Sequence, residues 1–315
     1  MRKGQNPAKF VEDVRRPERI TAAVLNYIPF LSGYYAESLD VLKACLQSMG
    51  RDAGLKFDTM VFDNGSCEAV REFLVDEKEA GHIQYLVLSE RNMGKGGAWN
   101  VILGGAPGEI IAYCDSDVLF SPGWLGRSVQ ILETFPGVGM VTARPFRTPP
   151  EFYESTLAWA RTSAKAEMGN FIPWETFLEF NLSLGQTETE NREVYARTHD
   201  WRLMYNGVEA FAGASHWQFV GFKSRLQKFL PFEMGKPMGE VRQLDRRVNE
   251  AGMLRLMVPD PLAMNMSNTL GKLHAVPREG RVQRGRGLAK QVLELGPIRR
   301  LLLALYNRIF LWYYS

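Results

Sequence analysis

The chain has 315 residues and a formal net charge of +3, and 45% of its residues are hydrophobic while 23% are charged. This composition is that of an ordinary soluble globular protein, large enough to fold around a core without disulfides. The three cysteines, Cys45, Cys67 and Cys114, show no C-x-x-C spacing, which disfavours a zinc site or a secreted framework and favours a reducing compartment. The polar start of the chain and the lack of a run of roughly 18 apolar residues predict neither a secretory signal nor a membrane span. A cytoplasmic location is therefore expected.

Strand and helix signals alternate along the first 145 residues. Such alternation predicts an α/β fold with a mainly parallel sheet, in which ligands bind at the carboxyl ends of the strands. Strands are expected to start at Ile20, Phe57, Ile83, Glu109 and Val138.

The helices between these strands are predicted from apolar spacing and capping residues. The helix near Ser38 should bury Leu39, Leu42, Leu46 and Met49, and Ser66 should cap the helix that starts at Glu68. A glycine-rich loop and a short helix through Trp99, and a helix from Pro122 to about Phe135, complete this part.

Beyond Arg147 the pattern changes, and residues 148–205 are predicted to be helical and loop-like. A strand is expected from His216, a helix from about Glu240 to Ala251, and a last strand from Leu254.

The carboxyl ends of the predicted strands carry the unusual polar residues of the chain, which are Asn26, Asp63-Asn64, Arg91-Asn92 and Asp115-Asp117. Asp115 and Asp117 point the same way in extended backbone, so their oxygens converge on one spot. Such a pair suits Mg²⁺ or Mn²⁺ bound together with diphosphate oxygens. The alternative is a solvated loop that happens to carry two acids.

Two further clusters are predicted to bind a nucleotide. Asp63 can accept a hydrogen bond from the imide N–H of uracil or from a ribose hydroxyl, although an Asp-Asn-Gly turn needs no ligand. In the segment from Ser89 to Asn100, Arg91, Asn92 and Lys95 surround glycines that allow close approach of a ligand. A purely structural turn is the alternative.

In order and spacing these clusters resemble the motifs of the inverting family 2 glycosyltransferases of the GT-A fold. The likeness runs from about Ile20 to Arg144, with a weaker echo near Glu240. The family motifs are an Asn that ends the first strand, a D-[DN]-G-S turn, an N-x-G-x-x-x-A-x-N loop and a D-x-D. They correspond here to Asn26, Asp63–Ser66, Asn92–Asn100 and Asp115–Asp117.

The resemblance implies a GT-A fold with a mainly parallel central sheet flanked by helices. It implies transfer of a sugar from a UDP-sugar, or alternatively a GDP-sugar, to a glycan, lipid-linked or protein acceptor, with Mn²⁺ or Mg²⁺ as cofactor. In the family the second Asp of the D-x-D, here Asp117, is the metal ligand. The first Asp, here Asp115, lies near the ribose and helps Asp117 to hold the metal. Asp63 then contacts the base and Asn26 lies near the nucleotide. The expected divisions are an N-terminal tail (1–18), a donor half (19–147), an acceptor and catalytic half (148–270) and a basic, amphipathic, helical tail (271–315).

Two family positions are changed in this sequence. The family's E-D pair is Glu240-Val241 here, so the resemblance makes Glu240 the candidate general base. Asp245 and Glu233 are alternatives, and Glu240 could also be an ordinary surface residue without a catalytic role. An inverting transfer needs such a base to take the proton of the acceptor hydroxyl. The family's downstream His is replaced by Asn265, so either Asn265, His274 or water completes the metal site.

The acceptor side and the end of the chain give weaker predictions. Trp174, His216 and Trp217 are candidates for an acceptor groove, although tryptophan more often packs in a core. The segment from Lys272 to Arg308 contains nine Lys or Arg and only two Glu, and the chain ends in apolar and aromatic residues. This pattern predicts peripheral contact with the anionic inner face of a membrane, with docking on the chain itself or on a second copy in a homodimer as the alternative. No nucleic-acid partner is expected.

Two other functions fit parts of the sequence. The string CDSDV also fits haloacid-dehalogenase-like phosphatases, with Asp115 as nucleophile and Asp117 as acid, but that fold places the motif on its first strand. A non-catalytic nucleotide-sugar-binding protein would explain the replaced acid at Val241 and the missing His at Asn265.

Overall fold

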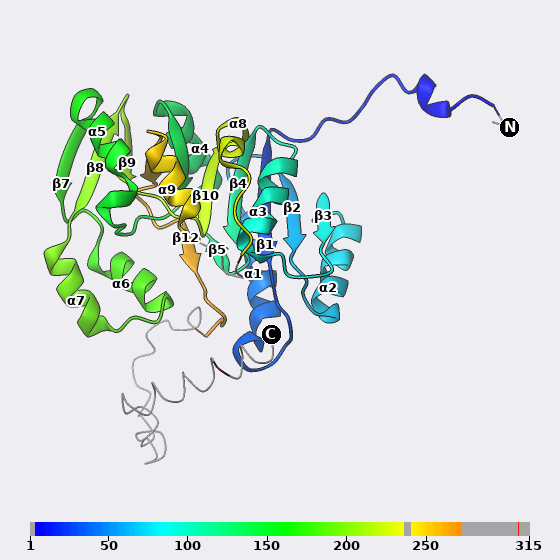
Figure 1. The fold of residues 1–315 in the computed structure, drawn as a ribbon, viewed down its shortest axis with the longest axis horizontal. Helices are drawn as coiled ribbons and strands as arrows, with labels where there is room; N and C mark the ends of the chain where they lie inside the picture. The colour runs from blue at the N-terminus through cyan, green and yellow to red at the C-terminus, as the bar shows by residue number, and fades with distance from the viewer. Residues whose placement is uncertain (1–3, 236–240, 272–307, 309–315) are drawn as a thin grey trace, which may run out of the picture. The chain divides into compact units, whose positions relative to one another are not determined.

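The computed structural model describes residues 4–235, 241–271 and 308. The described residues up to 271 belong to one compact unit, built on a sheet of ten strands (Figure 1). In sheet order these are β3 (Tyr85–Leu88), β2 (Asp58–Asp63), β1 (Ile20–Asn26), β4 (Ile110–Asp115), β10 (Gln218–Phe222), β6 (Val138–Thr142), β11 (Leu254–Met257), β9 (Val208–Ala212), β8 (Asp200–Tyr205) and β7 (Lys165–Gly169). A second, two-stranded sheet pairs β12 (Ala263–Asn265) with β5 (Val118–Phe120).

The first part of the sheet is parallel, as the alternating sequence predicts. Strands β3, β2, β1 and β4 pair in parallel, and β11 pairs in parallel with β6. Strand β10 enters between β4 and β6 in the opposite direction. All seven residues of β1 are buried, which is the signature of a parallel strand covered on both faces. The predicted α/β fold class is confirmed.

Nine α-helices are described: α1 (Ser38–Gly50), α2 (Glu68–Glu79), α3 (Gly94–Gly105), α4 (Trp124–Thr134), α5 (Glu154–Ser163), α6 (Trp174–Ser183), α7 (Glu188–Arg197), α8 (Lys223–Leu226) and α9 (Gln243–Glu250). None of the helices in the described part of the chain is both long and apolar enough to cross a bilayer. In α1 the buried side chains are Val41, Leu42, Cys45 and Met49. The predicted face was therefore partly wrong: Leu42 and Met49 are buried as expected, but Leu39 and Leu46 are only half-buried.

The segment 148–205 holds more strand than predicted. Strands β7 and β8 pair antiparallel within it, and β9 joins them to β11. They escape a pattern-based prediction because β7 has no buried residue and carries charged side chains. Glu167 and Arg202 form a cross-strand ion pair at 2.5 Å between their carboxylate and guanidinium. Such a pair stabilises the strand pairing where the alternation of apolar residues is missing.

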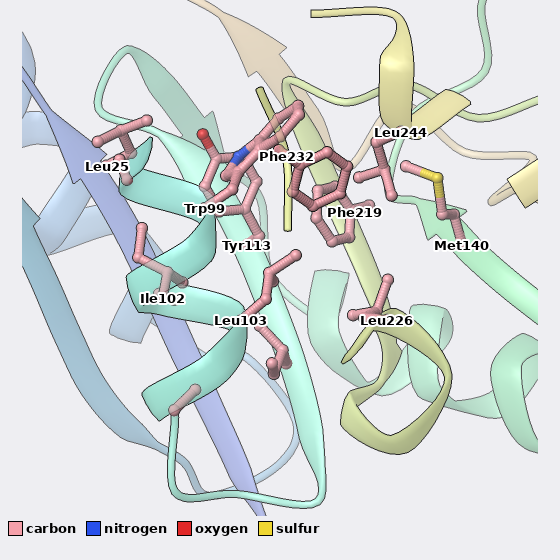
Figure 2. Packing of buried hydrophobic residues seen from close by; sticks show 14 of the residues in the cluster. Leu25, Trp99, Ile102, Leu103, Tyr113, Met140, Phe219, Leu226, Phe232 and Leu244 are labelled. Carbon is pink, nitrogen blue, oxygen red and sulfur yellow. The ribbon is translucent and has the colours of Figure 1, made fainter. Parts of the chain in front are cut away.

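A core cluster of buried side chains joins α3 to strands β1, β4 and β10 (Figure 2). Trp99 of α3 packs edge-on against Phe232, with ring centroids 5.2 Å apart. Tyr113 of β4 stacks on Phe219 of β10 at 4.9 Å. Trp99 also packs edge-on against Tyr113, with ring centroids 5.9 Å apart, so two aromatic contacts hold Tyr113 near the end of β4.

Candidate active site

The carboxyl ends of three neighbouring strands bring the predicted polar residues together. In the sheet register Asn26 of β1 lies opposite Asp63 of β2, and Leu25 lies opposite Asp115 of β4. The amide of Ser116 extends this pairing by donating to the carbonyl of Leu25 at 3.1 Å. The predicted gathering of strand-end residues at one edge of the sheet is therefore present.

Asn26, Asp63 and Ser66 form a buried polar network at this edge. The Asn26 amide donates to Asp63 Oδ1 at 2.9 Å and to Ser66 Oγ at 3.0 Å. The backbone N–H of Ser66 donates to Asp63 Oδ2 at 3.0 Å. Asn26 and Asp63 are both 0% exposed, so in this conformation neither presents a surface to a ligand. The network holds the β2–α2 turn, and Ser66 serves it rather than capping α2, whose N-cap is Cys67.

The turn after β2 is bonded to the start of α3. The Asn64 side chain donates to Asn92 Oδ1 at 2.9 Å and accepts from the N–H of Met93 at 2.8 Å. Gly65, at φ +88°, lies so close that a Cβ there would come within 2.9 Å of the Arg91 backbone carbon. Arg91 and Asn92 themselves are exposed. This packing places two of the predicted nucleotide-binding residues on the surface beside the buried network.

The glycines of the predicted loop belong to helix α3 instead. Gly96 and Gly97 are buried in its first turns. A Cβ on Gly96 would lie 2.1 Å from the carbonyl oxygen of Glu233. Asn100 fixes the same segment, donating to the carbonyl of Phe232 at 3.0 Å and accepting from its N–H at 2.7 Å. The predicted loop is therefore the start of a helix, whose glycines admit a neighbouring chain segment. Its role in ligand binding stays a prediction.

Asp115 is held by two partners. Lys95 Nζ lies 2.7 Å from Asp115 Oδ2, and the Tyr113 hydroxyl donates to Oδ1 at 2.6 Å. Lys95 also lies over the rings of Trp99, at 5.4 Å, and Tyr113, at 5.9 Å. Burial, followed by the charge of Asp115, raises the pKa of Tyr113 well above its usual range, so the phenol stays a donor. Sequence reasoning missed Tyr113, although its position two residues before Asp115 on the same strand face was the available signal.

Asp117 differs from Asp115 in having an oxygen without a partner. Its Oδ1 is closed off from solvent and makes no hydrogen bond, while Oδ2 accepts from the Asn265 amide at 3.3 Å. Burial, then the charge of Asp115, raises the pKa of Asp117 to about 7. A buried, unpaired carboxylate oxygen costs about 1–3 kcal/mol, and a hard cation is the ligand that would offset that cost.

The donor set therefore fits a Mg²⁺ or Mn²⁺ ion held by Asp117 with help from Asp115. Asn265 orients Asp117, and its own Oδ1 accepts from the N–H of Ser267 at 2.8 Å. Within the described part of the chain no group of three or more His, Cys, Asp or Glu could hold a metal. The remaining ligands would then come from the substrate or from water. His274 lies outside the described residues.

The model of glycosyl transferase family 2 matches residues 34–199, more than half of the chain. The chain belongs to glycosyl transferase family 2. The predicted resemblance is confirmed, and with it the GT-A fold class. A first-strand position for the D-x-D, as the phosphatase alternative requires, is contradicted because the motif follows β4.

Other similar proteins include an uncharacterized glycosyltransferase of Nostoc sp., 29% identical over 84 residues, which are 27% of this chain and 26% of the relative. A mannosyltransferase from Pyrobaculum calidifontis, solved with GDP-Man and Mn²⁺, is 17% identical with a TM-score of 0.48, over 84% of this chain and 59% of that one. S. aureus TarS 1–349, solved with UDP-GlcNAc, is 15% identical with a TM-score of 0.46, over 78% of this chain and 57% of that one. The chain thus spans about a quarter of the curated relative it matches.

The predicted acceptor residues of this family 2 member lie in different surroundings. Trp217 is 8% exposed and stacks on Phe180 at 5.7 Å, while its carbonyl accepts from the N–H of Asp115 at 2.9 Å. Trp174 packs in α6 against Tyr195, at 5.2 Å between rings. Trp217, and with it the preceding residue His216, therefore lies beside Asp115. The described ring contacts of Trp174 are with Phe177 and Tyr195 instead.

The candidate general bases are unequal. Asp245 is 5% exposed, and its oxygens pair with His216 Nδ1 and Arg255 Nη2, each at 2.5 Å. Burial lowers the pKa of Arg255, and Asp245 opposes that shift. Asp245 is therefore part of the interior, whereas Glu233 is exposed. Glu240 lies outside the described residues and stays a prediction.

Proposed function

We propose that this protein transfers a sugar, with inversion, from a nucleoside diphosphate donor to a hydroxyl acceptor, with Mg²⁺ or Mn²⁺ held at Asp117. One observation carries the proposal: a buried carboxylate oxygen of Asp117 lacks a partner beside a carboxylate, Asp115, that is already paired with Lys95. Family membership supports the reaction class.

The proposed metal site uses Asp117 as the protein ligand and Asp115 as its neighbour. When bound, the ion would neutralise charge on the two phosphates of the leaving nucleoside diphosphate. Lys95 holds Asp115 in place and adds a positive charge beside the diphosphate. Arg91, on the exposed turn next to it, is proposed to contribute the second cation.

The proposed nucleotide site lies at the ends of β1 and β2. Asn26 and Asp63 form its floor through the network with Ser66, and Asn92 shapes its rim by accepting from the N–H of Gly94 at 2.7 Å. Direct contact between Asp63 and the base requires a conformation in which the carboxylate reaches the surface, since it is buried here. We therefore propose that Asp63 acts first by holding the turn. A UDP-sugar is the favoured donor by the family resemblance, with a GDP-sugar as the alternative.

The acceptor is proposed to be a glycan, a lipid-linked sugar or a protein. Contact with an anionic membrane, or pairing with a second copy, rests on the tail from residue 271 onward, which lies almost wholly outside the described residues. The cytoplasmic location, peripheral on the inner face of the membrane, belongs to the same proposal.

A thermal-shift screen of UDP- and GDP-sugars, each with Mn²⁺ and with a chelator, tests the function. We expect stabilisation by one nucleotide class only when Mn²⁺ is present, and release of the nucleoside diphosphate in a turnover assay. Asp117→Ala should abolish turnover, whereas Asp76→Ala, on the exposed face of α2, should leave it unchanged. Turnover of Asp117→Ala at the wild-type rate would contradict the proposal that Asp117 holds the metal. Metal-dependent donor binding without any turnover would select the non-catalytic binding protein instead.

A further inference from the structure

A chain of three side chains connects the interior to His216. Arg255 of β11 is 0% exposed and donates to the carbonyls of Ala214, at 2.5 Å, and Phe152. Its Nη2 also pairs with Asp245 Oδ1, and Asp245 Oδ2 lies 2.5 Å from His216 Nδ1. Side chains of α9 and β11 thus fix the orientation of one imidazole in the segment before β10.

This arrangement decides which nitrogen of the ring is available. A carboxylate only accepts hydrogen bonds, so the Nδ1 that faces Asp245 carries the hydrogen and, in the neutral ring, Nε2 carries the lone pair. Among the described residues no hydrogen bond involves Nε2 of His216, whose side chain is 19% exposed. His216 is only partly buried, so its Nε2 is open to a ligand.

The ring lies on the donor side of the molecule. The next residue, Trp217, accepts through its carbonyl from the N–H of Asp115 at 2.9 Å. Trp99 lies between the two sites, with its ring 6.4 Å from that of His216 and 5.4 Å from the ammonium of Lys95. His216 is thus separated from the Lys95–Asp115 pair by a single aromatic ring.

We propose that His216 is the catalytic base of the transfer, oriented by Asp245 and anchored through Arg255. This inference rests on the proposed function, and it makes His216 the rival of Glu240 for the role of base. The acceptor oxygen forms a bond to the anomeric carbon as the bond from that carbon to the diphosphate breaks. The electron pair leaves with the nucleoside diphosphate, and the acceptor proton moves to Nε2 of His216. With water as acceptor, the products are the free sugar and the same nucleoside diphosphate.

The test compares His216→Asn with wild type, because the Asn amide can still donate to Asp245 and so preserve the fold. The assay is release of UDP or GDP from the sugar nucleotide selected by thermal shift, in the presence of Mn²⁺. We expect kcat to fall by about 10²–10⁴, with the donor Kd and the melting temperature close to wild type. His82→Asn is the matched control, since His82 also pairs through Nδ1 with a carboxylate, that of Glu77, at 2.9 Å but on the surface.

A second variant separates catalysis from positioning. His216→Ala should lose the same activity and regain about 10-fold of it when imidazole is added, because a free base can then take the proton. Near-wild-type kcat in His216→Asn, loss without imidazole rescue, or loss confined to Glu240→Gln would each overturn the proposal. Failure of the proposed function is seen separately, as a wild-type protein that neither binds any sugar nucleotide with Mn²⁺ nor releases its diphosphate.

Discussion

Replacing Asp117 by Asn should stabilise the metal-free protein at high pH. The pKa of Asp117 in the folded protein, about 7, lies above its ordinary value of 3.8 because burial disfavours the charged form. The folded state therefore holds the proton more tightly than the unfolded state does. Its contribution to stability is complete at low pH and is lost as the pH rises from about 4 to about 7. Asn, which does not ionise, avoids this loss.

The size of the effect follows from the same shift. At about 1.4 kcal/mol for each pKa unit, a rise from 3.8 to about 7 has an upper limit of ~4 kcal/mol. The side chain as a whole is only half-buried, and the new amide also lacks a partner at the Oδ1 position. We therefore expect a net gain of about 1–2 kcal/mol, or roughly 2–6 °C in melting temperature for a unit of this size.

The assay is thermal unfolding of wild type and Asp117→Asn in a chelator at pH 5 and pH 8. The difference between the two proteins should grow between these pH values, since only wild type pays the cost of ionisation. Asp76→Asn, at an exposed position, should show no such growth. A difference that is equal at both pH values would refute the reasoning. At pH 8, added Mn²⁺ should raise the melting temperature of wild type and leave Asp117→Asn unchanged.

Three further changes have expected outcomes. Lys95→Met should weaken UDP or GDP binding with Mn²⁺ by about 10-fold or more in calorimetry, because one buried cation is worth roughly 1.5–3 kcal/mol to an anion; unchanged affinity would contradict its assignment. Asp63→Ala leaves a buried amide unpaired, so we expect about 1–3 kcal/mol less stability in urea unfolding and weaker donor binding. A variant as stable as wild type would contradict the stabilising role of Asp63. Gly96→Ala should cost about 1–3 kcal/mol, because its Cβ would meet the Glu233 carbonyl, whereas Gly105→Ala has open space and should be neutral.

The parallel half of the fold and its polar edge could be predicted because the local signals agree with the tertiary structure. The strand that starts at Ile20 is buried throughout, so its apolar run has one interpretation. Asp115 and Asp117 follow such a strand, and parallel pairing alone places them beside Asn26.

What could not be predicted depends on contacts between distant segments. Gly96 reads as a loop glycine until the carbonyl of Glu233 is found against it. His216 is predicted only as a candidate for an acceptor groove, because nothing in the sequence shows that it pairs with Asp245, which in turn pairs with Arg255. No spacing in the sequence encodes these pairings, because their partners come from other elements of the fold.

The most direct measurement is a crystal of wild-type protein soaked with Mn²⁺ and UDP or GDP, with anomalous data collected for manganese. We expect one manganese peak within coordination distance of Asp117, bridging to the diphosphate, and the nucleoside over the turn that Asp63 supports. A peak bound away from Asp117, or a nucleotide seated on another face of the molecule, would contradict the account.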